Sequence, residues 1–387
     1  MRSLAVDNRS ARHRISECIN CGKCTWACPV SHRTGEFSPR RIAEEYLVSG
    51  AVPRDKGLWA CTTCAMCSKL CTSGVEFHEF VREVRPDLRQ RLLADATHGS
   101  VFHAIQGLSS LPHISPRKGE WVMQRMQIDS ESSTLLFVGC TPFFDVVFGH
   151  IRADLLDIPR SSVALMNAMG VKPRLLEAER CCGHDAYWLG DHDTFLRLAE
   201  ANVRAIEAVG VDRVVAFCPE CYSTIKNVYP KFLGPLGFEV ISLTGLIGEA
   251  VGEGRMDLAA TDLTYTYQDS CRLARHAGIV EEPRNVLRRV GSLAEMPRSG
   301  ALAACCGTSC WTNCDGSTKE WQLERLEEAS RTGADALVTA CPKCLIHLEC
   351  AQHEHPEGAA RRRVHLVDIH VLAAGLLSNT RGRSPLA

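Results

Sequence analysis

The sequence predicts an all-helical domain at the amino terminus, followed by two α/β domains that repeat one pattern. The chain of 387 residues is too long for one ordinary domain and can bury a core in each of two or three. The hydrophobic pattern is helical to about residue 95. From residue 134, strand-like runs alternate with helices, twice in the same order. We therefore expect domains at 1–95, 134–255 and 256–387, with a connecting segment at 96–133.

In the amino-terminal domain we expect a helix between two cysteine-rich loops. Ser38 is a residue type that caps helices, Pro39 suits the first helical position, and Gly50 can end the helix. A second helical stretch follows Cys71, and Pro86 is expected to kink or divide it.

In the α/β part, each strand-like run ends on a cysteine. These runs are TLLFVGC, RVVAFC, LTYTYQDSC and ALVTAC, which end on Cys140, Cys218, Cys271 and Cys341. Ligands in open α/β units bind outside the carboxyl ends of the strands. Equivalent cysteines of the two halves are separated by 123 to 131 residues, which indicates an internal duplication. Each half is therefore expected to gather its thiols at one edge of one sheet.

Composition excludes several classes of protein. Net charge is −1 and basic residues are interleaved with acidic ones, so the sequence has no cluster of basic residues that would bind nucleic acid. The apolar stretch LVDIHVLAAGLL is too short to span a bilayer and is interrupted by Asp368 and His370. The first residues do not resemble a signal peptide. We expect a cytoplasmic protein without direct membrane insertion, in which 21 cysteines indicate metal or redox chemistry rather than disulfides.

Eight cysteines form two runs of the same spacing. The first run is Cys18, Cys21, Cys24 and Cys28, and the second is Cys61, Cys64, Cys67 and Cys71. This spacing lets consecutive thiolates bind successive corners of a cubane 4Fe–4S cluster, and in two-cluster proteins the fourth cysteine serves the other cluster. We therefore assign one cluster to Cys18, Cys21, Cys24 and Cys71, and the other to Cys61, Cys64, Cys67 and Cys28.

Zinc is the alternative metal for these runs. Isolated Cys-x2-Cys pairs are typical of zinc sites, whereas three cysteines at this spacing favour an iron–sulfur cluster. The proline after Cys28 fits the cluster pattern, and Thr72 departs from it after Cys71 without removing a ligand.

Ten further cysteines form two sets of five. The first set is Cys140, Cys181, Cys182, Cys218 and Cys221, and the second is Cys271, Cys305, Cys306, Cys341 and Cys344. Two adjacent cysteines cannot easily occupy two corners of one small tetrahedral site, and a single zinc needs only four ligands. Each set therefore favours a cluster with more than one iron.

The sequences around these sets resemble a known family. CCGHDAYW with CPECYSTIK, and CCGTSCWTNC with CPKCLIHL, are similar to the paired cysteine-rich domains of heterodisulfide reductase. Residues 1–95 are similar to the small ferredoxin-like subunit of that enzyme, and residues 134–387 to its catalytic subunit, so the chain resembles the fused D-type subunit. The resemblance implies a noncubane 4Fe–4S cluster in each five-cysteine set and cleavage of a disulfide between the two clusters.

The same layout leaves a second function open. Iron–sulfur subunits of glycolate oxidase, of anaerobic glycerol-3-phosphate dehydrogenase and of complex-type benzoyl-CoA reductase resemble it too, so the chain can be an electron-transfer subunit without its own substrate. The resemblance implies a hetero-oligomeric complex with a flavoprotein, a ferredoxin or a membrane quinone module as partner. No nucleotide or flavin is expected on this chain, because GEAVGEG follows a helix rather than a strand.

Other residues near the sets have two interpretations each. Cys310, Cys314 and Cys350 are inert packed thiols, or the first two border the second set as redox thiols. His184 and His347 pack in the core or donate protons to a departing thiolate. Three aromatic residues either pack in the core or line a substrate pocket or an electron path: Tyr187, Trp188 and Trp311. Three charged residues are candidates for tuning the electrostatics of the clusters: Asp269, Glu220 and Lys343.

Overall fold

The computed structural model describes residues 8–51, 57–90, 96–114, 121–124, 126–151, 153–307, 309–355 and 363–378. The chain divides into two units that do not follow one another simply along the sequence. The first unit comprises the residues up to 107 together with 183–195 and 307–321. The second comprises 108–182, 196–306 and 322 onwards. Two short segments that follow the cysteine doublets therefore belong to the unit of the amino terminus.

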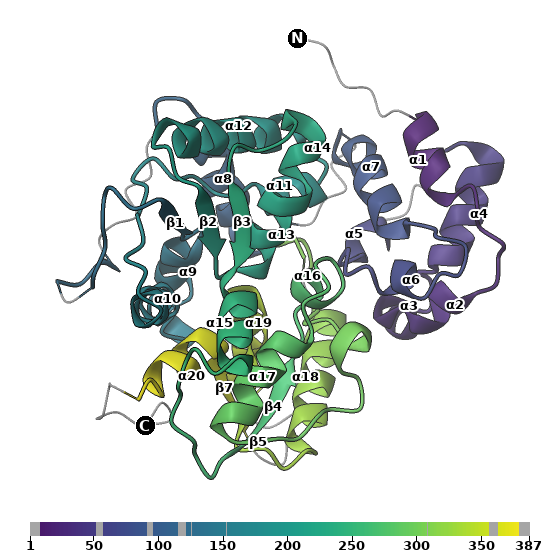
Figure 1. Ribbon diagram of the computed structural model, residues 1–387. Coiled ribbons are helices and arrows are strands. Elements are labelled where there is room, and N and C mark those ends of the chain that lie inside the picture. Colours follow the sequence, from purple (N-terminus) through teal and green to yellow (C-terminus); the bar gives the residue numbers. More distant parts are fainter. Residues whose placement is uncertain are drawn as a thin grey trace. The chain divides into compact units, whose positions relative to one another are not determined.

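Helices make up the regular structure of the first unit (Figure 1). They are α1 (Asn8–Ile15), α2 (Lys23–Ala27), α3 (Pro29–Thr34), α4 (Pro39–Ser49), α5 (Gly57–Ala60), α6 (Met66–Lys69), α7 (Phe77–Gln90), the 3-10 turn η1 (His98–Ser100), most of α8 (Val101–Ser109), α11 (His184–Trp188) and the starts of α12 (His192–Ala208) and α18 (Gly316–Ser330). Among the residues described in this unit no strand occurs.

The expected caps of α4 are confirmed. The Ser38 side chain accepts a hydrogen bond from the Arg41 N–H, Pro39 is the first helical residue, and Gly50 ends the helix at φ 67°. Pro86 does not divide α7, which continues to Gln90. The Pro86 ring packs on Gly190, where a Cβ atom would lie 2.6 Å from the proline Cδ. Gly190 also has φ 73°. The lack of room for a Cβ atom and the positive φ angle therefore both require glycine at this position.

The second unit contains two parallel sheets (Figure 1). One has the order β1-β2-β3 and the other the order β5-β4-β6-β7. The strands are β1 (Thr134–Phe137), β2 (Arg213–Ala216), β3 (Glu239–Ser242), β4 (Thr264–Gln268), β5 (Ser292–Leu293), β6 (Ala336–Thr339) and β7 (His365–Asp368). A single bridge from Leu135 to Arg174 lies beside β1 as β5 lies beside β4, so the two sheets share one strand order.

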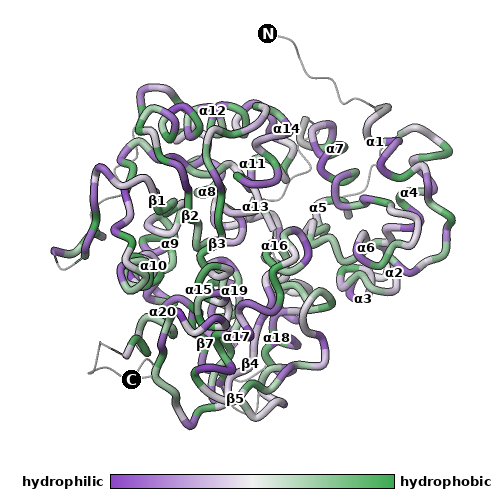
Figure 2. The backbone as a smooth tube through the Cα atoms, in the orientation of Figure 1, coloured by the Kyte–Doolittle hydropathy of each residue, from purple (hydrophilic) through white to green (hydrophobic). Residues whose placement is uncertain are grey.

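The strands carry the buried apolar residues that parallel sheets require. All four residues of β1 and of β6 are buried, and the hydropathy of β1 can be followed in Figure 2. The remaining elements of this unit are α9 (Thr141–Val147), η3 (Gly149–Ile151), α10 (Asp157–Ala168), α13 (Pro219–Asn227), α14 (Tyr229–Leu233), α15 (Leu243–Gly252), α16 (Cys271–Ala274), α17 (Glu281–Val290), η4 (Gly300–Leu302), α19 (Pro342–Glu354) and α20 (Ile369–Gly375).

The two halves of the second unit pack through two corresponding pairs of helices. Helix α15 contacts α17, and α10 contacts α20. By their order in each half, α10 corresponds to α17 and α15 to α20, so the two contacts are related by an approximate two-fold axis. A Cβ atom at Gly248 in α15 would lie 2.3 Å from the Glu282 carbonyl oxygen, so only glycine allows this close approach. Thr244 Oγ1 and His370 Nε2 form a hydrogen bond of 3.1 Å between α15 and α20.

None of the described helices has the length and apolar character that crossing a membrane requires.

Candidate metal centres

The two cysteine runs of the first unit line two hollows. One hollow is lined by Cys18, Cys21, Cys24, Cys67 and Cys71, and the other by Cys28, Cys61, Cys64 and Cys67. Thus Cys71 lies with the first run and Cys28 with the second. Positive φ angles at Asn20 (58°), Gly22 (83°), Thr63 (48°) and Ala65 (61°) turn the two loops around these hollows.

The second hollow is the more deeply buried of the two. Cys61 and Cys67 are buried, whereas Cys21 at the first hollow is exposed. Burial is the main cause that raises the pKa of the Cys61 thiol to about 12 and that of Cys28 to about 11, and neighbouring thiolates contribute to both values. Binding of a cation would favour the thiolates that burial and mutual repulsion disfavour. A set made only of soft sulfur donors suits iron–sulfur clusters.

The first five-cysteine set lies at the carboxyl ends of β1 and β2. Cys140 begins α9 just after β1, and Cys218 begins α13 just after β2. The thiols of Cys182 and Cys221 form a hydrogen bond, as do those of Cys221 and Cys218. Gly139, beside Cys140, has φ 68°, and a Cβ atom there would lie 2.8 Å from Cys221 Sγ. The fold therefore brings residues distant in sequence together as the strand pattern predicts.

Three buried polar residues hold the first set in place, and no sequence pattern pointed to them. Both carboxylate oxygens of Glu179 accept backbone N–H groups, from Val138 and Gly139, each at 2.8 Å. The hydroxyl of Tyr229 donates to the Cys182 carbonyl at 3.0 Å, and the Asn202 amide donates to the Cys181 carbonyl at 3.0 Å. The doublet is thus fixed through its own backbone.

The second five-cysteine set has the same position on the second sheet. Cys271 begins α16 after β4, and Cys341 begins α19 after β6. The thiols of Cys305 and Cys306 form a hydrogen bond, as do those of Cys306 and Cys344. A hydrogen bond with Cys305 lowers the pKa of Cys271, and the nearby cations of Arg272 and Arg275 lower it further.

The two sets meet within the second unit. The thiols of Cys218 and Cys341 form a hydrogen bond, and both residues are the first cysteine of a Cys-Pro-x-Cys pair. Two residues further on in each pair, Lys343 Nζ lies 2.9 Å from Glu220 Oε2, and both side chains are largely buried. Because these pairs occupy equivalent positions, the approximate two-fold axis passes between the two sets.

In the first unit, Arg85 joins the second hollow to the segments that follow the doublets. Its guanidinium is fully buried and donates to the carbonyl oxygens of Leu58 at 3.2 Å, Cys61 at 2.6 Å and Trp188 at 2.7 Å. The guanidinium carbon also lies 5.0 Å from the centre of the Trp59 ring. One cation thus satisfies three backbone acceptors from three parts of the chain.

Cys310 lies near this arginine and is fully buried. Its Sγ is 4.0 Å from Arg85 Nη1 and 3.1 Å from Ser309 Oγ. Trp311 stacks on Phe102 with ring centres 4.1 Å apart. Of the other two additional cysteines, Cys314 is exposed, and Cys350 is buried with its Sγ 3.1 Å from Glu354 Oε1.

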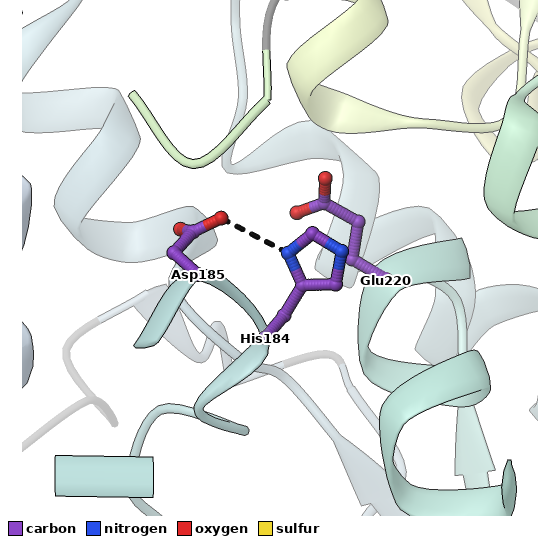
Figure 3. A group of neighbouring side chains, drawn as sticks. All are labelled: His184, Asp185 and Glu220. Carbon is purple, nitrogen blue, oxygen red and sulfur yellow. Dashed lines mark hydrogen bonds and ion pairs between the residues drawn. The ribbon is translucent and has the colours of Figure 1, made fainter. Parts of the chain in front are cut away.

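The other candidate side chains are buried, and several of them form hydrogen bonds. His184 Nδ1 and Asp185 Oδ1 are 2.9 Å apart (Figure 3), and Asp185 Oδ2 accepts from Gln106 at 3.0 Å. The hydroxyl of Tyr187 donates to Glu79 at 3.1 Å. His347 is buried in α19, one turn after Cys344.

Two known domain families match the chain. Residues 14–75 match the 4Fe-4S dicluster domain, and residues 135–226 and 265–349 each match the cysteine-rich domain family known as CCG.

Among curated proteins, the D-type subunit of heterodisulfide reductase from Methanosarcina barkeri is 26% identical over 375 residues, which cover 85% of this chain and 87% of the relative. EtfAB:quinone oxidoreductase of Syntrophomonas wolfei is 24% identical over 86% of this chain and 54% of its own length. One subunit of the fumarate reductase (CoM/CoB) of Methanothermobacter marburgensis is 25% identical over 87% of this chain and 68% of its own length.

The fold, the thiol groups and these matches define an iron–sulfur electron-transfer protein of the oxidoreductase class, with one dicluster domain and two cysteine-rich domains. Within that class, the chain is similar over 85% of its length to the D-type subunit of heterodisulfide reductase, and the resemblance expected from the cysteine motifs is confirmed.

We predict that Arg85→Met destabilises the first unit strongly. The substitution leaves three buried carbonyl oxygens without their donor, and hydrogen bonds from charged groups contribute about 1.5–3 kcal/mol each, so a loss of at least about 3 kcal/mol is expected. Anaerobic denaturant unfolding measures this loss. Arg331→Met is the control, because Arg331 is 75% exposed and pairs only at the surface with Glu327. Equal unfolding midpoints for Arg85→Met and the unaltered protein would contradict the role assigned to Arg85.

Proposed function

We propose that the chain binds four iron–sulfur clusters. Two cubane 4Fe–4S clusters would be held by Cys18, Cys21, Cys24 and Cys71, and by Cys61, Cys64, Cys67 and Cys28. One noncubane 4Fe–4S cluster would be held by each five-cysteine set, which we regard as the product of an internal duplication. The grouping of these cysteines around two hollows and at two sheet edges supports the proposal. Bound clusters would supply one-electron acceptors and donors.

We propose that the reaction is the reduction of a disulfide. The supporting observation is that two complete five-cysteine sets adjoin one another through Cys218 and Cys341. A disulfide has two sulfur atoms, and two adjacent sites provide one site for each of them. The net reaction takes two electrons from a redox partner and two protons from solvent, breaks the S–S bond and yields two thiols. The ion pair of Glu220 and Lys343 would hold α13 and α19 together while the site works.

The alternative is an electron-transfer subunit without its own substrate, and one surface favours it. Ile19 is 67% exposed and Trp26 is 75% exposed, and both lie within the first cysteine run, where Cys21 is exposed as well. Exposed aromatic side chains are common anchors of protein interfaces. We propose that a redox partner docks here in a hetero-oligomeric complex. This partner would be a flavoprotein, a ferredoxin or a membrane quinone module.

A chain with so many cysteine ligands suits a reducing compartment, and we propose the cytoplasm as its location.

We predict that Cys61→Ser lowers the iron content by about four atoms per chain, since it removes one ligand of a cubane cluster. Cys350→Ser is the matched control, because Cys350 is also buried but stands outside the four groups. Iron and acid-labile sulfide analysis after anaerobic reconstitution measures the difference. Zinc without inorganic sulfide in the native protein would refute the cluster assignment and favour the zinc alternative.

We predict that the reconstituted protein, reduced with a chemical reductant, releases two thiols for each disulfide consumed. The probes are the CoB–CoM heterodisulfide named for the Methanosarcina relatives and a set of small aliphatic disulfides. Cys341→Ser should lower this activity at least about tenfold while the cubane spectra persist, because its site lies in the second unit. A protein that accepts electrons but cleaves none of these disulfides would support the electron-transfer alternative instead.

We predict that Trp26→Ala slows reduction by a reduced ferredoxin roughly tenfold, as loss of an interface anchor does. Reduction by dithionite should keep its rate, since that small reductant needs no docking surface. Val146→Ala is the control, because Val146 is 82% exposed but lies outside the cysteine runs. Stopped-flow absorbance measures both rates. An unchanged ferredoxin rate would exclude this surface as the docking site.

A further inference from the structure

The two five-cysteine sites differ in charge at equivalent positions. In the second site Cys271 is followed by Arg272, which is 2% exposed, and by Arg275. Arg275 donates to the carbonyl oxygens of Ala301 at 3.3 Å and Ala303 at 2.8 Å, so its guanidinium is fixed beside the loop that leads to the second doublet. Two cations therefore lie close to this set.

The first site has no cation at the same two positions. By their spacing from Cys140, Thr141 and Phe144 correspond to Arg272 and Arg275. Thr141 is 1% exposed and Phe144 is 5% exposed, so both contribute uncharged bulk to the first site.

A buried carboxylate adds to this difference. Glu179 stands two residues before the first doublet, is 2% exposed, and binds the N–H groups of Val138 and Gly139 beside Cys140. The corresponding position before the second doublet is Ala303. The first site therefore has an acidic residue where the second has none.

One arginine does stand beside the first doublet, and its side chain is only half-buried. Arg180 precedes Cys181, and its guanidinium donates to the carbonyl oxygen of Ser109 and, in an exposed contact, to that of Leu111 at 2.7 Å. Water and salt screen a charge in such a position, whereas a buried charge such as that of Arg272 is screened much less.

The other charged groups near the two sites largely cancel. Lys343 and Glu220 form an ion pair with each other across the axis. Asp269, which precedes Cys271, accepts two hydrogen bonds of 2.9 Å from Arg284, and Arg284 also binds Glu295, whose side chain is 35% exposed and whose charge water screens. The difference that remains is the buried Arg272 at the second site against the buried Glu179 at the first, because Arg275 and Arg180 are both half-buried.

We infer that Arg272 and Arg275 give the cluster of the second five-cysteine set a higher reduction potential than the cluster of the first set. The inference rests on the proposed function, because it needs a cluster in each set. Reduction adds one electron to a cluster, and in a buried site of low dielectric a nearby cation stabilises the added negative charge, while a nearby carboxylate opposes it. Electrons shared between the two sites would accordingly reside mainly at the second.

The test is a potentiometric titration of the reconstituted protein, followed by electron paramagnetic resonance. Signals are assigned with Cys182→Ser and Cys306→Ser, each of which alters one site. In the unaltered protein the second site should have the higher potential. The double variant Arg272→Gln with Arg275→Gln should lower that potential by at least about 59 mV, which is a tenfold change in a one-electron equilibrium. The double variant with lysine at both positions should keep most of the difference, because it keeps both charges.

The control is Arg331→Gln, which removes an exposed arginine and should leave both potentials unchanged. Iron content and the cubane potentials show that each variant is folded and loaded. Clusters present in both sets with equal or reversed potentials, or glutamine variants without a shift, would overturn this inference alone. Iron analysis that finds no cluster in either set would overturn the proposed function and this inference together.

Discussion

The second unit depends on the meeting of two Cys-Pro-x-Cys pairs across an approximate two-fold axis. Each pair begins a helix directly after a parallel strand, so the proline takes the first helical position, where no N–H is needed. The strand fixes the position of the first cysteine, and the helix brings the second to the same side one turn later. Because Cys218 and Cys341 touch, the two sheets can be placed only with these ends together. The helix contacts of α15 with α17 and of α10 with α20 maintain that placement.

Buried polar side chains complete both units by satisfying backbone groups near the thiols. Arg85 does so in the first unit, and Glu179, Asn202 and Tyr229 do so at the first five-cysteine set. Loops that bend around a metal site leave carbonyl and N–H groups without partners in secondary structure, and an unsatisfied buried group is costly. Fixed partners therefore keep each thiol in one position, which a cluster with several irons requires.

Sequence reasoning succeeded where local rules determine the structure. The capped helix at Pro39–Ser49 follows from Ser38 and Gly50, and the strands that end two or three residues before a cysteine follow from short apolar runs. It could not place residues that act through distant backbone groups. Tyr229 and Asn202 look like ordinary helix residues, and their bonds to the doublet depend on how α12 and α14 pack. The assignment of residues 183–195 and 307–321 to the first unit likewise depends on tertiary contacts such as that of Arg85 with Trp188.

The contrast between local rules and tertiary contacts also explains how two similar domains can place equivalent cysteines in different surroundings. In the proposed function the geometry of a cluster would restrict the cysteines, whereas the residues beside them only have to fill space and avoid unpaired buried charge. A threonine and a phenylalanine meet that requirement in the first half. Two arginines meet it in the second, where Arg275 is satisfied by the carbonyl oxygens of Ala301 and Ala303. Charge can therefore differ between the halves without loss of the fold, and the inferred difference in reduction potential between the two sites would follow from this freedom.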